Sequence, residues 1–121
     1  MKNCLIVDDS RLMRRLARKA VEPLQFNISE AENGQDALDQ CRKAMPDAIM
    51  LDWNMPVMSG IDFLRALRDL EGGGKPVVIF CTTESDPDKI SEAIAAGANE
   101  FIMKPYDADI VQLKFEQAGA L

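Results

Sequence analysis

Four charged side chains in this sequence each follow a short apolar run, where they can bind a metal ion or a phosphoryl group: Asp8, Asp9, Asp52 and Lys104. Continuous apolar runs with polar residues at their ends are typical of strands that are covered on both faces of a parallel sheet. In open α/β sheets, ligands bind just beyond the carboxyl ends of the strands. We therefore expect the three carboxylates and the ammonium group to meet at one end of a sheet.

The three carboxylates favour a site for a divalent cation. Asp8 and Asp9 repel each other, and a cation with oxygen ligands relieves the repulsion; Mg²⁺ needs only one or two carboxylates. Acids before a helix also stabilise its amino terminus, which is an alternative interpretation of this pair taken alone. Asp52 argues against that alternative, because a third negative charge raises the free energy of the empty pocket. Helix capping alone does not account for that cost. Beside Mg²⁺, a carboxylate can also act as a nucleophile toward a phosphoryl group.

Two further polar side chains follow the last two predicted strands. Thr82 follows Phe80-Cys81, and its hydroxyl can donate a hydrogen bond to a phosphoryl oxygen, although a threonine at a strand end is ordinary by itself. Lys104 precedes Pro105, and its ammonium can reach the same oxygens as a point charge. Together with the acids, these groups predict phosphorylation of the protein on Asp52.

Composition excludes several other functions. The chain has 121 residues, which suits one domain, and a formal net charge of -6, which argues against nucleic acid as a partner. It has no histidine, so Ser–His and Cys–His catalysis and most transition-metal sites are excluded. Its three cysteines form no Cys-x-x-Cys pair, no apolar stretch approaches the ~20 residues of a membrane helix, and the start does not resemble a signal peptide. We expect a cytoplasmic protein that binds neither nucleic acid nor membranes.

The alternation of short apolar runs with longer helical stretches predicts the fold. The five runs are Cys4–Val7, Phe26–Ser29, Ala48–Leu51, Val77–Cys81 and Phe101–Met103. Alternating strands and helices form a parallel sheet with helices on both faces, and right-handed crossovers favour a doubly wound order. We expect an α/β fold, a five-stranded, flavodoxin-like (βα)5 sheet with the strand order 2-1-3-4-5.

Local signals predict where the five helices begin. The predicted starts are after Ser10, after Asn33-Gly34, after Gly60, at Asp86-Pro87 and near Asp107. The buried stripe of the first helix is predicted to be Met13, Leu16, Ala17, Ala20, Val21 and Leu24. Its other face carries Arg11, Arg14, Arg15, Arg18 and Lys19. This cationic face is either simply solvated or a docking surface for an acidic kinase or phosphotransfer domain.

These positions together resemble the receiver domain of two-component response regulators. The resemblance spans the whole chain and rests on Asp8-Asp9, Asp52, Thr82 and Lys104-Pro105 at four strand ends. Within that family the sequence is most similar to the CheY-like single-domain receivers of chemotaxis. The closer similarity rests on Ile6–Ser10 with Met13–Arg15, Asn54–Pro56 with Gly60, and Thr82–Glu84.

The resemblance implies a role for each site residue. Asp52 is the expected phosphoacceptor, and Thr82 and Lys104 are expected to bind the phosphoryl oxygens. The expected Mg²⁺ ligands are Asp8 through water, Asp9, Asp52 and the backbone carbonyl of Asn54.

Two more pairs are implied by the same resemblance. Thr82 and Phe101 occupy the positions of the conformational switch, and the bond between Lys104 and its proline is expected to be cis. Asn54 and Glu84, two residues beyond the acceptor and the threonine, match the pair found in receivers that lose phosphate quickly. A transient signal is therefore expected.

The expected function is that of a single-domain response regulator, with residues 1–121 as the receiver and no output domain. A histidine kinase or histidine phosphotransfer protein would supply the phosphoryl group, and the monomeric protein would then bind a target, expected to be the flagellar motor switch. It is not expected to be an enzyme beyond self-catalysed phosphotransfer and autodephosphorylation. The expected binding surface comprises Ile90, Ile94, Phe101, Met103, Tyr106 and Lys114. The alternative is a phosphorelay intermediate or phosphate sink without motor binding.

Two other protein classes fit the sequence less well. A flavodoxin needs a phosphate-binding loop rich in Ser, Thr or Gly after the first strand, where Asp8-Asp9 would repel the phosphate of FMN. A haloacid-dehalogenase-type phosphatase needs Asp-x-Asp at the same place and room for a cap domain. This chain has adjacent aspartates there and no such room.

Overall fold

The computed structural model describes residues 1–83 and 86–121, so the prediction for Glu84 lies outside the described residues. The described strands form a sheet in the order β2-β1-β3-β4-β5, in which all neighbouring pairs are parallel. Their bounds are β1 Asn3–Val7, β2 Asn27–Ala31, β3 Ala48–Asp52, β4 Val77–Thr82 and β5 Glu100–Met103. The predicted α/β fold and strand order are confirmed.

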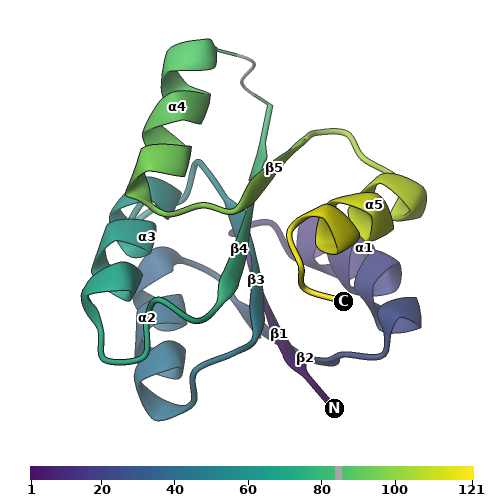
Figure 1. Ribbon diagram of the computed structural model, residues 1–121, viewed down its shortest axis with the longest axis horizontal. Helices are drawn as coiled ribbons and strands as arrows, with labels where there is room; N and C mark the ends of the chain where they lie inside the picture. The colour runs from purple at the N-terminus through teal and green to yellow at the C-terminus, as the bar shows by residue number, and fades with distance from the viewer. Residues whose placement is uncertain (84–85) are drawn as a thin grey trace.

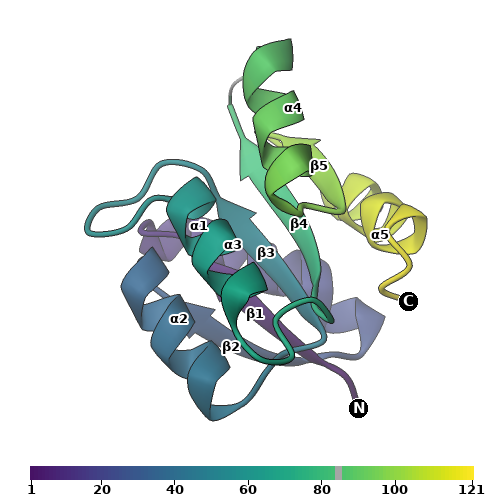
Figure 2. The same ribbon diagram turned by 60° about the vertical axis from the view of Figure 1, so that its left-hand side comes forward.

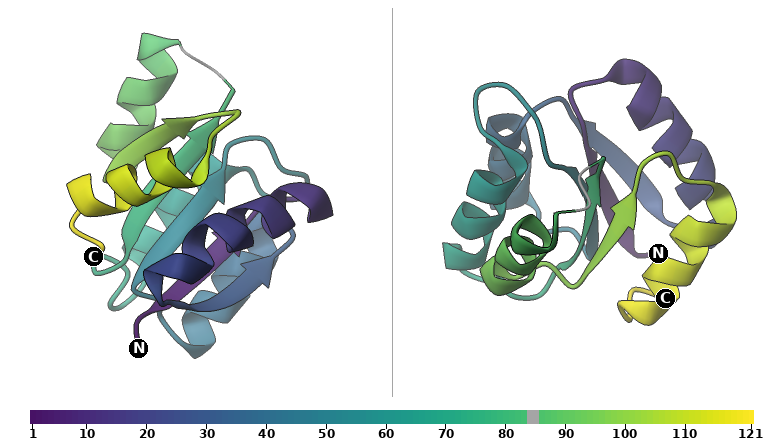
Figure 3. Two further views of the ribbon diagram at one scale, coloured as in Figure 1. Left: turned by 90° about the vertical axis from the view of Figure 1, so that its right-hand side faces the viewer. Right: turned by 90° about the horizontal axis from the view of Figure 1, so that it is seen from above.

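Helices cover both faces of this sheet (Figure 1). They are α1 Arg11–Val21, α2 Gly34–Lys43, α3 Gly60–Asp69, α4 Pro87–Ala96 and α5 Ala108–Gln117, with a 3₁₀ turn, η1, at Glu22–Leu24. Helices α1 and α5 pack together on one face, and Figure 2 shows α3 between α2 and α4 on the other. Seen from above, the sheet separates the two layers (Figure 3). Buried apolar side chains fill both interfaces, including Phe63 and Leu64 on the α3 side and Phe26 and Phe115 on the α5 side.

The helices begin within one residue of the predicted starts, and α2 and α3 begin one residue early, at Gly34 and Gly60. In each, the side chain of the capping residue accepts a hydrogen bond from a main-chain N–H of the first turn; the caps are Ser10, Asn33, Ser59, Asp86 and Asp107. Each cap satisfies an amide that the helix itself leaves unpaired. The caps therefore fix where the chain turns after each strand, and the polar side chains of interest lie in or just before four of these turns.

Some predictions about packing and boundaries were wrong. Leu16 was placed in the buried stripe of α1 but is 46% exposed, and Leu24 lies in η1. Strand β2 lies at the edge of the sheet and alternates exposed with less exposed residues, so its weak apolar signal misplaced its bounds. Within residues 1–83 and 86–121, every helix is too short or too polar to cross a membrane.

Candidate functional site

Strand register brings four strand ends together at the carboxyl edge of the sheet. Val7 of β1 pairs with Leu51 of β3, and Asp52 pairs with Cys81 of β4. Because all the strands are parallel, the residues that end or follow them share this edge: Asp8, Asp52, Thr82 and Lys104. Residues far apart in the sequence are thus brought into one site, as their positions after apolar runs predict.

Lys104 joins two of the acids. Its Nζ donates hydrogen bonds to Asp52 Oδ1 at 2.7 Å and to Asp8 Oδ2 at 3.1 Å. The three side chains are only 9% to 14% exposed. Each ion loses solvation in such a pocket, so the two carboxylates depend on the shared ammonium to lie this close together.

Asp9 completes a cluster of three acids. One carboxylate oxygen from each of Asp8, Asp9 and Asp52 lies within 4.8 Å of the others, and Asp9 is exposed whereas the other two are buried. Hard oxygen donors that leave one side open to water suit Mg²⁺, which binds oxygen at about 2.0–2.1 Å and keeps several waters. The donor set therefore fits this metal.

The electrostatics of the cluster depend on burial and on Lys104. Burial raises the pKa of the Asp52 carboxyl; the bond from Lys104 opposes the rise, and the charge of Asp8 adds to it. For Lys104, burial acts to lower the pKa, but the bond to Asp52 and the charges of both acids outweigh it, so its pKa is raised. A divalent cation at the cluster favours the ionised carboxylate, which is the nucleophilic form of Asp52.

An open hollow lies beside the cluster. It has a volume of about 380 Å³ and is lined by Asp9, Trp53, Asn54, Met55, Pro56, Ser59 and Ile61. Trp53 packs against Phe80 with ring centroids 4.8 Å apart, which fixes one wall. The hollow opens beside Asp9, the exposed acid of the cluster, and Asn54 is part of its lining.

The two residues of the expected switch pair, Thr82 and Phe101, differ from each other in burial and in distance from the acids. Thr82 is buried at the end of β4, where its carbonyl accepts a hydrogen bond from the main-chain N–H of Lys104 at 2.8 Å. Phe101 pairs with Phe80 in the sheet and is half-buried, with Lys114 Nζ 5.3 Å from its ring centroid. Thr82 is therefore part of the site, whereas Phe101 belongs to a neighbouring surface. The peptide bond between Lys104 and Pro105 is cis, as expected.

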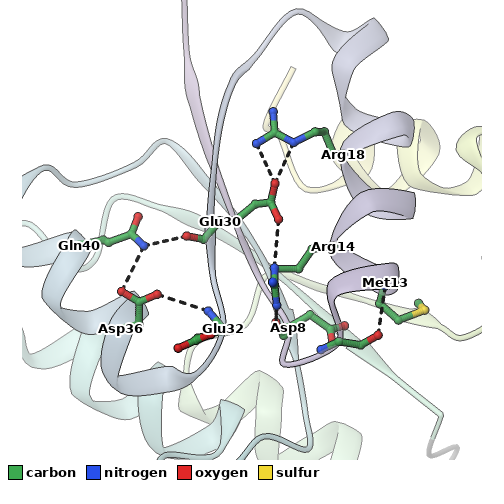
Figure 4. Close-up of polar contacts among 9 residues, drawn as sticks. Asp8, Met13, Arg14, Arg18, Glu30, Glu32, Asp36 and Gln40 are labelled. Atoms are coloured by element: carbon green, nitrogen blue, oxygen red, sulfur yellow. Dashed lines mark hydrogen bonds and ion pairs between the residues drawn. The ribbon is translucent and has the colours of Figure 1, made fainter.

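Sequence reasoning did not assign Arg14 or Glu30 to the site. Arg14 was expected on an exposed cationic face, yet its side chain is 15% exposed and bonds both Glu30 and the carbonyl of Asp8 (Figure 4). Arg18 bonds the same glutamate. The available signal was the i,i+4 spacing of the two arginines, which places both side chains on one face of the helix. The exposed cationic surface of α1 is thus reduced to Arg11, Arg15 and Lys19.

Known proteins share this sequence and geometry. The family model for the response regulator receiver domain matches residues 4–115. The chemotaxis protein CheY of Pseudomonas aeruginosa is 40% identical over 114 residues, which cover 93% of this chain and 92% of that protein. The chemotaxis protein CheY-3 of Vibrio cholerae is 39% identical over 114 residues, covering 93% of this chain and 88% of that protein.

Structural comparison gives the same result. The chemotaxis protein CheY4 of Vibrio cholerae has a solved structure that matches this one with a TM-score of 0.92 at 30% identity, covering 98% of each chain. Sequence and fold thus agree over almost the whole length of the chain and of its relatives. The chain belongs to the response regulator receiver domain family, and it is a CheY-like member of two-component signalling.

Proposed function

We propose that the protein accepts a phosphoryl group on Asp52 from a histidine kinase or histidine phosphotransfer protein and signals in the phosphorylated state. The observation that carries this proposal is the 2.7 Å contact between Lys104 Nζ and Asp52 Oδ1 at a cluster of three acids. It combines a nucleophile, a cation for the phosphoryl oxygens and a donor set for Mg²⁺ in one pocket.

The reaction is a displacement at phosphorus. A carboxylate oxygen of Asp52 attacks the phosphorus of a phosphohistidine, so a P–O bond forms as the P–N bond breaks. The imidazole leaves with the electron pair and takes up a proton. Lys104 offers its positive charge to the phosphoryl oxygens, and the Thr82 hydroxyl donates a hydrogen bond to one of them.

The acids supply the metal site that this reaction needs. Asp9, Asp52 and the backbone carbonyl of Asn54 would hold Mg²⁺, with Asp8 acting through water. When bound, the metal neutralises charge on the phosphoryl oxygens. Asp8 also holds Lys104 in place through its 3.1 Å bond, so the ammonium is oriented before the phosphoryl group arrives.

The output surface proposed here is the one formed by α4, β5 and α5. It includes a hollow of about 400 Å³ lined by Phe101, Ile102, Met103, Pro105, Tyr106, Asp107, Ile110 and Lys114. On α4, Ile94 is 46% exposed. Movement of Thr82 toward the phosphoryl group would change the packing around Phe101 and so alter this surface. The target is the flagellar motor switch, a proposal supported by relatives that are named chemotaxis proteins.

Trp53 gives a direct test of the phosphoacceptor, because its ring lines the hollow beside Asp9. Addition of Mg²⁺ should change its fluorescence, and beryllofluoride, which mimics a phosphoryl group on a carboxylate, should change it again. Asp52→Asn should abolish the second change, whereas Asp39→Asn, an exposed acid on α2, should not. A full beryllofluoride response in Asp52→Asn contradicts the assignment.

A second experiment separates the two possible outputs. The protein is captured with purified motor-switch protein in the presence and absence of beryllofluoride. Binding that rises at least several-fold with beryllofluoride supports the motor switch as target. Unchanged binding, together with rapid reversible phosphate exchange with a histidine phosphotransfer protein, supports a phosphorelay intermediate or phosphate sink.

A further inference from the structure

Every main-chain and side-chain polar group of Asp8 makes a hydrogen bond. Its main-chain N–H donates to Ala31 O at 3.1 Å, and its carbonyl accepts from Arg14 Nη1 at 2.7 Å. One carboxylate oxygen accepts from the main-chain N–H of Ser10 at 2.9 Å, and the other from Lys104 at 3.1 Å. The carbonyl of Asp8 belongs to the peptide group that connects it to the next residue, so the bond from Arg14 fixes the plane from which Asp9 projects.

Arg14 is in turn held by Glu30 (Figure 4). Arg14 Nε donates to Glu30 Oε1 at 3.0 Å, and Arg18 Nε and Nη2 lie 2.9 Å and 2.8 Å from Glu30 Oε2. The backbone of Glu30 is fixed as well, because its carbonyl accepts from Gln40 Nε2 at 2.8 Å. One carboxylate on the neighbouring strand thus orients the guanidinium that holds the Asp8 carbonyl.

This chain of contacts reaches the acids without touching the proposed metal. Burial acts to raise the pKa of Glu30, but hydrogen bonds from Arg18 and Arg14 outweigh it, so the pKa is lowered and the carboxylate stays charged. The side chain of Arg14 is 15% exposed, so solvent screens its two bonds only in part. Contacts of this kind around metal ligands typically change metal affinity by 10- to 100-fold.

We propose that Glu30 and Arg14 are positioning residues that set the affinity of the acidic cluster for Mg²⁺ by fixing the peptide plane between Asp8 and Asp9. The inference rests on the proposed function, because it requires that the cluster binds Mg²⁺. When the bond from Arg14 to the Asp8 carbonyl is lost, this peptide can rotate, and Asp9 no longer projects toward the other two carboxylates.

The test is the Kd for Mg²⁺ alone, measured by titration calorimetry and by Trp53 fluorescence. Glu30→Gln keeps the shape of the side chain but loses its charge, and Arg14→Lys keeps the charge but cannot bond two acceptors in fixed directions. Each should raise the Kd by about 10-fold. The double variant should bind about as weakly as the weaker single variant, because both act through one contact.

Matched controls separate positioning from simple loss of charge. Glu32→Gln removes the same charge two residues along the chain, where the residue is exposed, and should change the Kd by less than about 2-fold. The effect of Glu30→Gln should also persist in 0.5 M KCl, which screens exposed charges.

Two negative results are distinguishable. If the native protein does not bind Mg²⁺, the proposed function fails. If it binds Mg²⁺ but Glu30→Gln matches Glu32→Gln, or its effect disappears in KCl, the positioning role is overturned. Urea unfolding shows whether each variant is folded, and Arg14→Lys carries the test should Glu30→Gln not fold.

Discussion

Lys104 Nζ and Asp52 Oδ1 lie 2.7 Å apart although the two residues are 52 positions apart in the sequence. The ammonium is shared with Asp8, so one positive charge serves two buried carboxylates while Asp9 adds a third negative charge nearby. Without a bound cation, the cluster therefore has an excess of negative charge. This imbalance raises the free energy of the metal-free protein and favours the binding of a cation, which is a common relation between stability and function.

The first prediction concerns stability of the metal-free protein. Burial and the charges of Asp8 and Asp9 raise the pKa of Asp52 despite Lys104, so the folded state holds a proton on Asp52 more tightly than the unfolded state. Stability therefore falls as pH rises from 3.8, the ordinary value, through the folded pKa. Asp52→Asn removes that loss. It should raise the free energy of unfolding at pH 7 by about 1 kcal/mol, the usual size of a single stabilising substitution.

Urea unfolding in EDTA between pH 4 and pH 7 checks this expectation. The advantage of Asp52→Asn should shrink as the pH falls toward 3.8. Asp39→Asn is the control, because Asp39 is 55% exposed and its ion pair with Arg42 contributes little. An asparagine variant that is less stable than the native protein at pH 7 contradicts the prediction.

The second prediction concerns Mg²⁺ and the exposed acid of the cluster. At ten times its Kd, Mg²⁺ should stabilise the native protein by about 1.4 kcal/mol. Asp9→Asn should lose this gain and change the stability in EDTA by less than about 0.5 kcal/mol, since Asp9 is exposed. Thermal unfolding with and without Mg²⁺ measures both effects. A gain that is the same in both proteins shows that the metal binds elsewhere.

The helix starts and the central contact of the site could both be predicted from the sequence, for different physical reasons. Helix starts were predictable because a cap such as Asn33 or Asp107 acts on an amide three residues away. The meeting of Asp52 and Lys104 was predictable once the strand order was inferred, since parallel strands end at one edge.

The contacts that surround the site could not be predicted in the same way. The bond between Arg14 and Glu30 depends on how α1 lies across β2, and no local spacing encodes that placement. The exposure of Leu16 has the same origin: the period of the helix gives a stripe, but the neighbouring helix decides how wide the buried part is.

The third prediction concerns Arg68, which bridges two loops, the α3–β4 and α4–β5 connections, at the opposite edge of the sheet from the acids. Its guanidinium donates to the carbonyls of Gly73, Pro76 and Gly97 and to Asn99 Oδ1, at 2.6 Å to 3.2 Å. All of these acceptors are neutral, and burial lowers the pKa of the guanidinium. Arg68→Lys keeps one charge but cannot reach four acceptors at once, so it should lower the free energy of unfolding by about 2 kcal/mol.

Arg65→Lys provides the matched control for this change. Arg65 lies one turn earlier on α3 and pairs with Glu92 at 3.4 Å, with both side chains about half exposed. Such a pair contributes less than about 1 kcal/mol, so this variant should be close to the native protein in urea. Equal losses in the two lysine variants would show that the hydrogen bonds of the part-buried Arg68 guanidinium add nothing.

The fourth prediction concerns Val57, in the loop that joins β3 to α3 beside the site. Its φ of 69° lies in the left-handed region, and its side chain is 82% exposed, so no packing offsets the strain. The left-handed conformation costs an L-residue about 1–2 kcal/mol, and a β-branched side chain makes it rarer still. Val57→Gly removes this cost but adds backbone entropy to the unfolded chain, which offsets about 0.5–1 kcal/mol of the gain.

The net expectation is that Val57→Gly raises the free energy of unfolding by up to about 1 kcal/mol, measured in urea. Val57→Ala tests the cause, because alanine keeps the Cβ and so keeps most of the left-handed penalty; it should gain less than glycine. Val57→Asn should also raise the free energy of unfolding, because asparagine tolerates this region and does not add the backbone entropy that glycine gives the unfolded chain. If all three variants have the same free energy of unfolding as the native protein, the left-handed conformation of Val57 costs no measurable stability, and the prediction is wrong.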